Sequence, residues 1–189
     1  MTAEIIENAP RALITPEAKQ RLDLYIKLAS YEISGLGKVQ PINQRDIFIS
    51  DVFILEQEVS FDSTELDSKT LSKWLTKIVQ EGKNPVHYKC WWHSHNDMRV
   101  FWSNTDRATI EKFGSDWMVS IVGNKRGDYL VRLDIFQPFR LTVDNLKLEM
   151  YYPENPSLKA KIQREIKAKV KKQVYHSPFS EFSKERKAK

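Results

Sequence analysis

Apolar side chains recur along this chain with two different periods, one typical of α-helices and the other of β-strands. The helical period is clearest over residues 71–79, where apolar residues fall at i, i+3, i+4, i+7 and i+8. Gly82 and Pro85 then end the helix. A second helix is predicted over residues 15–30, because a threonine and a proline suit its N-cap and its first helical position. Both helices therefore present an apolar face to a core.

Strand-like segments occupy much of the rest of the chain, either as apolar runs or as alternating apolar and polar positions. They cover residues 47–58, 86–95, 117–122 and 129–136, with 139–150 as one further strand or an irregular cover. The first is long enough to contain a bulge, and a short helix over residues 104–113 separates the second strand from the third. This order predicts a mixed α/β (α+β) fold, in which a mixed, largely antiparallel sheet is flanked by helices.

The two ends of the chain differ in character from the middle. Residues 1–13 are predicted to form a flexible arm, residues 14–152 one globular domain, and residues 153–189 a basic tail. Within the tail an apolar residue recurs every fourth position, which predicts an amphipathic helix to about Tyr175. This helix either docks on the core or binds a protein partner or an anionic surface.

The charge of +5 for the 189 residues is concentrated in that tail, which carries eleven Lys and Arg against four Asp and Glu. The remaining residues carry nineteen against twenty-one, so we do not expect a nucleic-acid partner for the protein as a whole. No apolar run approaches the ~20 residues of a membrane span, and the acidic N-terminus is unlike a signal peptide. The single cysteine, Cys90, excludes an internal disulfide framework, and together these features favour a cytoplasmic location.

Candidate chemistry lies at the end of the strand predicted over residues 86–95. His93 and His95 are two residues apart, so an extended strand presents both imidazoles on one face. Asp106 is a candidate third ligand, and three protein ligands with one open position are typical of catalytic zinc sites. Nitrogen and oxygen ligands suit zinc but do not exclude iron, cobalt or nickel.

Several neighbouring residues have alternative interpretations. The spacing Ser103-x-x-Asp106 also fits a helix-capping box, which is compatible with a ligand role for the aspartate. His87 lies too far along the strand to join the same metal ion, and Cys90 is predicted to face the opposite side. The aromatic pair Phe101 and Trp102 either lines a substrate groove or closes the core.

The pattern His93-Ser94-His95, seven residues, Ser103-x-x-Asp106 resembles the signature of the JAMM metalloproteases, also called the MPN-plus or JAB domain. That family also has an upstream glutamate shortly before a glycine, and Glu32 fits this place. The resemblance covers residues from about 11 to 152. It implies a JAB/MPN-like fold with the layering of cytidine deaminases, and zinc bound by His93, His95 and Asp106. It also implies that Glu32 acts as proton shuttle and that Ser103 is an oxyanion donor.

The same resemblance implies hydrolysis of an isopeptide or peptide bond at the C-terminus of a ubiquitin-like protein, free or in a conjugate. The compact length is similar to that of prokaryotic or phage members, and no extra segments for linkage selectivity are evident. The residue after the second histidine is often proline in the family, whereas here it is Asn96. The alternatives are a hydrolase that releases amino acids or acts on small peptides, and a non-catalytic MPN-like scaffold or binding module.

Overall fold

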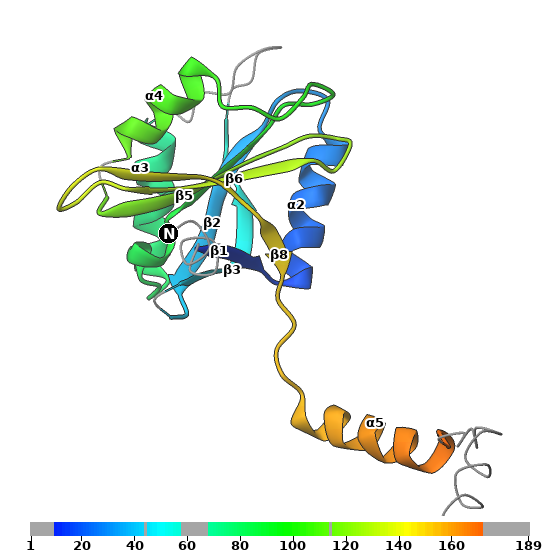
Figure 1. Cartoon of the computed structure of the whole chain (residues 1–189). Helices are drawn as coiled ribbons and strands as arrows, with labels where there is room; N and C mark the ends of the chain where they lie inside the picture. Colours follow the sequence, from blue (N-terminus) through cyan, green and yellow to red (C-terminus); the bar gives the residue numbers. More distant parts are fainter. Residues whose placement is uncertain (1–9, 44, 58–67, 114, 172–189) are drawn as a thin grey trace, which may run out of the picture. The chain divides into compact units, whose positions relative to one another are not determined.

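The structure is a computed structural model that describes residues 10–43, 45–57, 68–113 and 115–171. The chain forms two units, Met1–Tyr152 and Pro153–Lys189. The described part of the first unit contains one sheet with three α-helices, and that of the second contains the helix α5 (Pro156–Lys169) (Figure 1). Residues 1–9 of the predicted arm and the last eighteen residues of the predicted tail lie outside the described residues.

A mixed sheet of eight strands forms the centre of the first unit, in the order β7-β6-β5-β4-β2-β3-β1-β8. The strands are β1 (Arg11–Ile14), β2 (Ser34–Pro41), β3 (Asp46–Ile54), β4 (Cys90–Ser94), β5 (Trp117–Gly123), β6 (Tyr129–Ile135), β7 (Leu141–Leu146) and β8 (Leu148–Met150). The pairs β4–β5, β1–β3 and β1–β8 are parallel, and the other four pairs are antiparallel. The predicted mixed α/β class, with a mixed sheet flanked by helices, is confirmed.

Helices cover both faces of this sheet (Figure 1). On one face lies α2 (Pro16–Leu28), whose Ala18, Leu22 and Ile26 belong to the larger apolar core. On the other face lie α3 (Ser68–Gln80) and α4 (Asn104–Lys112), which contribute to a second, smaller core. The predicted Thr15 cap of α2 is confirmed, because its hydroxyl accepts a hydrogen bond from the N–H of Ala18. The predicted apolar face of α3 is only partly covered.

Strand β4 lies between the two cores, and its alternation decides what each residue does. Trp92 is fully buried in the larger core, where it stacks on Tyr25, whereas Trp91 belongs to the smaller core. Gly35 is paired with Trp92, and a Cβ at Gly35 would lie 2.7 Å from the indole and 2.0 Å from the Phe53 carbonyl oxygen. Only glycine therefore lets the indole pack against the backbone of β2.

Several predicted boundaries are wrong. Residues 11–13, which were predicted to belong to the arm, instead form β1 together with Ile14, paired with β3 and β8. The strand predicted from residue 86 begins at Cys90, because Asn84 caps the short 3₁₀-helix Pro85–His87. The segment 139–150, predicted as one strand or an irregular cover, forms the two strands β7 and β8, which are separated at Lys147.

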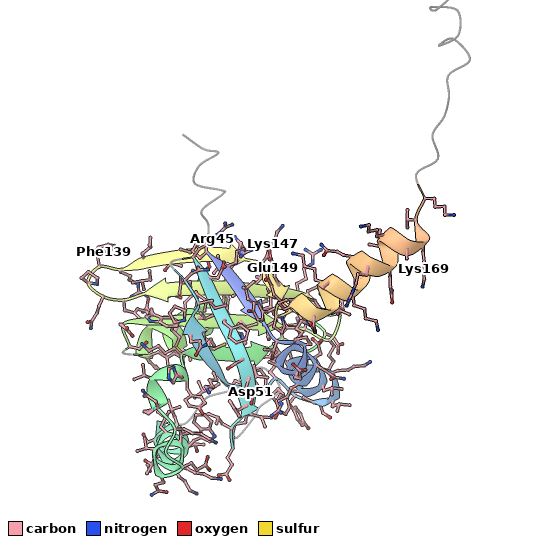
Figure 2. All side chains as sticks on the ribbon, turned by 90° about the horizontal axis from the view of Figure 1, so that it is seen from below. Arg45, Asp51, Phe139, Lys147, Glu149 and Lys169 are labelled. Carbon is pink, nitrogen blue, oxygen red and sulfur yellow. The ribbon has the colours of Figure 1, made fainter. Side chains whose placement is uncertain are left out.

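The C-terminal helix is also shorter than predicted, since α5 ends at Lys169 rather than near Tyr175. None of its residues is buried, and Figure 2 shows Lys169 projecting from its last turn. Both predicted roles of α5, docking on the core and binding a protein partner or an anionic surface, stay predictions. Among the described residues, no helix combines the length and the apolar character needed to cross a membrane. In the first unit, Phe139 stands exposed at the tip of the connection between β6 and β7 (Figure 2).

The ion pair that fixes β1 to β3 gives a pH-dependent prediction. Arg11 donates two hydrogen bonds of 2.7 Å to the Asp46 carboxylate, and these bonds lower the pKa of Asp46 to about 2. We expect Asp46→Asn to lower the free energy of unfolding by about 1–2 kcal/mol at pH 7. Because this pKa is lower in the folded than in the unfolded state, the stabilisation is complete above about pH 4. It is lost as the pH falls towards 2.

Urea unfolding of both proteins at pH 7 and at pH 2.5 measures this difference. The control is Glu149→Gln, since Glu149 lies 3.9 Å from Arg11 and its side chain is 42% exposed. Its stability should differ from the wild type by less than about 0.5 kcal/mol. An Asp46→Asn deficit that does not shrink between pH 7 and pH 2.5 would contradict the assignment.

Candidate metal centre

Three side-chain ligand atoms converge at the end of β4. The Nε2 atoms of His93 and His95 lie 3.2 Å apart. The Asp106 carboxylate places Oδ1 3.2 Å from His93 Nε2 and Oδ2 3.6 Å from His95 Nε2. All three residues are buried, and their ligand atoms lie within 4.8 Å of one another. This group could hold a metal ion.

The spacing of these atoms fits a tetrahedral ion. Ligands placed at about 2.0–2.1 Å from a tetrahedral zinc ion lie about 3.3 Å from one another. The two Nε2 atoms are 3.2 Å apart, and the two oxygens of the Asp106 carboxylate lie 3.2 and 3.6 Å from them, which is close to the spacing that one tetrahedral ion would require. Three protein ligands leave the fourth position of such an ion available to water or substrate.

A helix cap positions the aspartate. Ser103 is the N-cap of α4, and its Oγ accepts the N–H of Asp106 at 3.0 Å. In return Asp106 Oδ2 accepts the N–H of Ser103 at 2.7 Å, which completes the predicted capping box. The same two residues thus begin the helix and aim a carboxylate at the histidines, so the two interpretations of the Ser103-x-x-Asp106 spacing are compatible.

Burial and hydrogen bonding set the charge of the centre. Burial lowers the pKa of His93, and it would by itself raise the pKa of Asp106. For Asp106, hydrogen bonds to His93 and His95 outweigh burial, so its pKa lies far below its usual value. A buried, ionised carboxylate beside two imidazole nitrogens forms a site that attracts a cation.

A backbone carbonyl favours one tautomer of His95. Its Nδ1 lies 3.2 Å from the carbonyl oxygen of Arg99 and can donate to it, so that in the neutral tautomer this contact favours, Nε2 would be the ligand atom for a metal ion. Burial lowers the pKa of His95, but hydrogen bonds to Asp106 and to Arg99, with the charge of Glu32, raise it overall. The Glu32 carboxylate therefore lies within electrostatic reach of this ring.

Packing orients the other imidazole. His93 stacks on Trp91 with ring centroids 4.4 Å apart and planes 18° apart, and Trp102 lies on another side at 5.9 Å. Among the described residues no hydrogen-bond partner contacts His93 Nδ1. The ring is therefore held by aromatic contacts, where a metal ligand usually has a hydrogen bond.

Strand pairing brings Glu32 to the centre from sixty residues upstream. Ser34 is paired with His93 in the antiparallel ladder, and the Ser94 N–H donates to the Ile33 carbonyl at 2.8 Å. Continuing this register by one more residue on each chain places Glu32 opposite His95. Because alternate residues of a strand share a face, the side chain of Glu32 lies on the same side as both histidines. Glu32 is buried, with 7% of its surface exposed.

The loop between β4 and α4 takes a path that proline would not allow. Asn96 has a φ of 45°, in the left-handed region, whereas a proline ring holds φ near −65°. The Lys125 N–H donates to the Asn96 carbonyl at 2.8 Å, and the Asn124 amide donates to the Met98 carbonyl at 2.9 Å. The turn between β5 and β6 therefore holds the loop that leads to Ser103. Asn96, at a position where the JAMM pattern often has proline, therefore allows the left-handed backbone of this loop.

The two aromatic residues of this loop have different positions. Trp102 is partly buried and packs against the smaller core, so it closes the core. Phe101 has 47% of its surface exposed, and its ring meets that of His95 edge-on, with centroids 4.7 Å apart. Phe101 is therefore an exposed aromatic ring in contact with one of the three candidate metal ligands.

Cys90 and His87, which the sequence excluded as ligands, lie outside the candidate metal-binding group. Cys90 is fully buried in the larger core, and burial raises the pKa of its thiol to about 12, which excludes it as a nucleophile. His87 belongs to the 3₁₀-helix before β4 and is not in the metal-binding group. The prediction that His87 lies too far along the strand assumed a strand that begins at residue 86, whereas β4 begins at Cys90.

Sequence reasoning missed the residues that hold the site in place. Gln57 exchanges hydrogen bonds with the backbone N–H and C=O of Ser34, at 2.8 and 2.9 Å, and so fixes the start of β2 beside Glu32. Asn124 and the stacking face of Trp91 were not singled out either. Only Asn124 had a sequence signal, since it begins a turn that contains Gly127.

Comparisons with known proteins give a fold but no family. No family model matches the chain, and no curated protein matches it. Among solved structures, it is similar to the solution structure of a Desulfitobacterium hafniense protein determined by a structural genomics consortium. The TM-score is 0.53 at 12% identity, over 76% of this chain and 94% of that chain. At this identity the similarity shows the fold alone.

Proposed function

We propose that the protein is a zinc-dependent peptidase of the JAMM type. In this proposal it hydrolyses an isopeptide or peptide bond at the C-terminus of a ubiquitin-like protein, free or in a conjugate. The observation that carries the proposal is the convergence of His93, His95 and Asp106, with Glu32 on the same face of the sheet. A binding module would not need a buried acid, two buried imidazoles and a second buried acid in one place.

The donor set favours zinc among the metals that remain open. Two imidazoles and one carboxylate are typical ligands of catalytic zinc, and the ligand separations fit a tetrahedral ion. A zinc ion, when bound, would supply Lewis acidity and lower the pKa of a water ligand towards ~7. The protein's part is to hold three ligands rigidly and to leave one side accessible.

Glu32 is assigned the proton transfers. Its carboxylate lies on the face of His95, within electrostatic reach of that ring. A carboxylate there can accept a proton from the attacking water and return it to the departing amine, which makes Glu32 a general base and then a general acid. Burial at this position excludes competing solvent from the transfer.

Ser103 is assigned the stabilisation of negative charge on the substrate. Its Oγ accepts one hydrogen bond, from the N–H of Asp106, and a hydroxyl that accepts in this way can still donate its own proton. A donor fixed at the start of α4 can stabilise the oxyanion of a tetrahedral intermediate. No covalent bond between enzyme and substrate is needed in this reaction.

The substrate class rests on the resemblance of the His93–Asp106 pattern to the JAMM signature. The exposed ring of Phe101 beside His95 offers an apolar surface to an extended substrate tail. Selectivity for one linkage between modifiers is not part of the proposal. A small-peptide or amino-acid-releasing hydrolase uses the same chemistry, and the experiment below separates the two.

The test uses purified, zinc-loaded protein and a panel of fluorogenic substrates. One group carries a folded ubiquitin-like protein before the scissile bond, and the other carries only its last five residues. We expect kcat/KM to be at least tenfold higher for folded substrates, because a folded modifier adds binding surface. Equal rates on both groups would reject the modifier-specific proposal in favour of a small-peptide hydrolase. The absence of turnover on both, with zinc bound, would reject both.

A further inference from the structure

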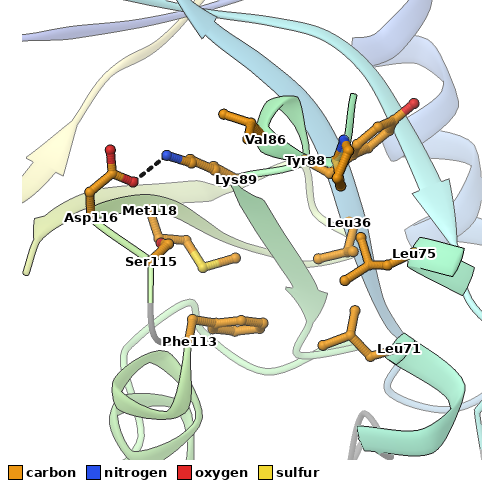
Figure 3. Close-up of a pocket in the computed structure, with 11 residues that line it drawn as sticks. Leu36, Leu71, Leu75, Val86, Tyr88, Lys89, Phe113, Ser115, Asp116 and Met118 are labelled. Carbon is orange, nitrogen blue, oxygen red and sulfur yellow. Dashed lines mark hydrogen bonds and ion pairs between the residues drawn. The ribbon is translucent and has the colours of Figure 1, made fainter. Parts of the chain in front are cut away.

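A cavity lies between α3 and the residues that follow α4, next to the start of β4 (Figure 3). Its volume is about 420 Å³. The apolar part of its lining is formed mainly by the side chains of Leu36, Leu71, Leu75, Val86, Phe113 and Met118. Lys89, at its rim, precedes His93 by four residues, or about 13 Å of extended chain. This cavity, here called the α3–α4 pocket, is therefore separate from the metal ligands.

The rim of the α3–α4 pocket carries one positive and one negative side chain. The Lys89 ammonium is hydrogen-bonded to the Asp116 carboxylate, and Figure 3 shows this pair across from Leu71 and Leu75. Only 14% of the Lys89 side chain is exposed, and its ammonium lies 5.0 Å from the centroid of the Trp117 ring. Lys89 is therefore held in place at the edge of an apolar cavity.

The backbone of Asp116 is equally well fixed, whereas its carboxylate remains accessible. Its carbonyl oxygen accepts the N–H groups of Phe136 and Gln137, at 2.7 and 3.3 Å. The Asp116 side chain is 56% exposed. An ammonium has three donors and a carboxylate about four acceptor positions, so both groups can bind a ligand while they remain paired.

We propose that the α3–α4 pocket binds a free amino acid with an aromatic or large aliphatic side chain. The side chain fills the cavity, the ligand carboxylate binds Lys89, and the ligand ammonium binds Asp116. A zwitterion suits this rim because a ligand with a single charge would be repelled by one member of the pair. A volume of about 420 Å³ is enough to admit an amino acid as large as phenylalanine or leucine.

The cavity also has the properties of ordinary ligand sites. Such sites are mostly apolar, with a few fixed polar groups that orient the ligand, and they begin at about 300 Å³. Both charged groups here lie on neighbouring strand ends, since Lys89 directly precedes β4 and Asp116 directly precedes β5. The proposal does not depend on the metal centre or on its proposed chemistry.

The test is a titration with L-phenylalanine, followed by NMR of the methyl groups. We expect saturable shifts at the methyl groups of Leu71, Leu75 and Met118, and none at Leu22 in the other core. Three analogues probe the rim: 3-phenylpropionate lacks the ammonium, phenethylamine lacks the carboxylate, and N-acetyl-L-phenylalaninamide lacks both charges. Each should bind at least fivefold more weakly than L-phenylalanine. If the uncharged amide binds equally well, the site recognises a peptide and the proposal is wrong.

Variants assign the binding to the rim and the cavity. Lys89→Met keeps the apolar stem and removes the charge, and it should weaken binding at least tenfold. Asp116→Asn keeps the side-chain volume and should weaken binding at least threefold. This variant tests the rim if Lys89→Met fails to fold. Leu75→Trp should abolish binding by filling the cavity, and Lys147→Met, on the surface outside the pocket, should leave binding unchanged. The proposal would be overturned if binding did not saturate, or if the Lys89 and Asp116 variants bound L-phenylalanine with the affinity of the wild type.

Discussion

Turnover is expected to fall by a factor of about 10²–10⁴ when Glu32 is replaced by Gln, while the protein still binds one metal ion. The amide keeps the size of the side chain but cannot accept a proton at neutral pH. Because Glu32 lies before β2, acts on His95 by its charge and is not one of the three convergent residues, its loss should leave the metal-binding group intact.

Two measurements on the same preparation check this prediction. Metal content by mass spectrometry should remain near one ion per chain, and kcat should collapse with little change in KM. A matched control is Glu81→Gln, which removes an exposed carboxylate that pairs with Lys83 at 2.6 Å. Turnover of Glu32→Gln within threefold of the wild type would show that another group accepts the proton.

His93→Ala is expected to remove the metal and the activity together. This change deletes one of three ligands and also the ring that stacks on Trp91. The bound metal should fall from about one ion per chain to less than about a tenth. Zinc at a hundredfold excess over its dissociation constant should stabilise the wild type by about 2.7 kcal/mol, and this gain should vanish in the variant.

The chain supplies its own control for this experiment. His87→Ala removes an imidazole of the same chemical type from the 3₁₀-helix before β4, outside the metal-binding group. Its metal content, zinc-dependent stabilisation and turnover should match those of the wild type. A wild-type protein that binds no metal under these conditions would reject both enzymatic proposals and leave the scaffold alternative.

Local patterns predicted the helices and most strands well. The cap at Thr15, the capping box at Ser103 and Asp106, and the mixed fold class all followed from short-range rules. The boundaries failed where distant contacts compete with local pattern. Residues 11–13 were predicted from the sequence to lie in a flexible arm. Pairing with β3, together with the contact between Arg11 and Asp46, instead makes them part of a strand. Asn84 and Pro85 shortened β4 through a turn that apolar periodicity does not detect.

The candidate site divides in the same way. Spacing alone places His93 and His95 on one face and gives Asp106 its position in the first turn of a helix, since both depend on contacts within a few residues. Spacing cannot bring Glu32 to His95, because that proximity comes from the register between β2 and β4. The same holds for Gln57 beside Ser34 and for Asn124 beside Met98.

The sequence by itself therefore determined the ligand types, their local geometry and the class of fold. The tertiary structure alone decided the separations of 3.2 to 3.6 Å among the ligand atoms, the aromatic support of His93 and the exposure of Phe101. The α3–α4 pocket also became visible only there, since residues 36, 75, 89 and 116 come from four separate segments. The physical reason is that periodicity records which face a residue occupies, whereas pairing and packing decide what that face meets.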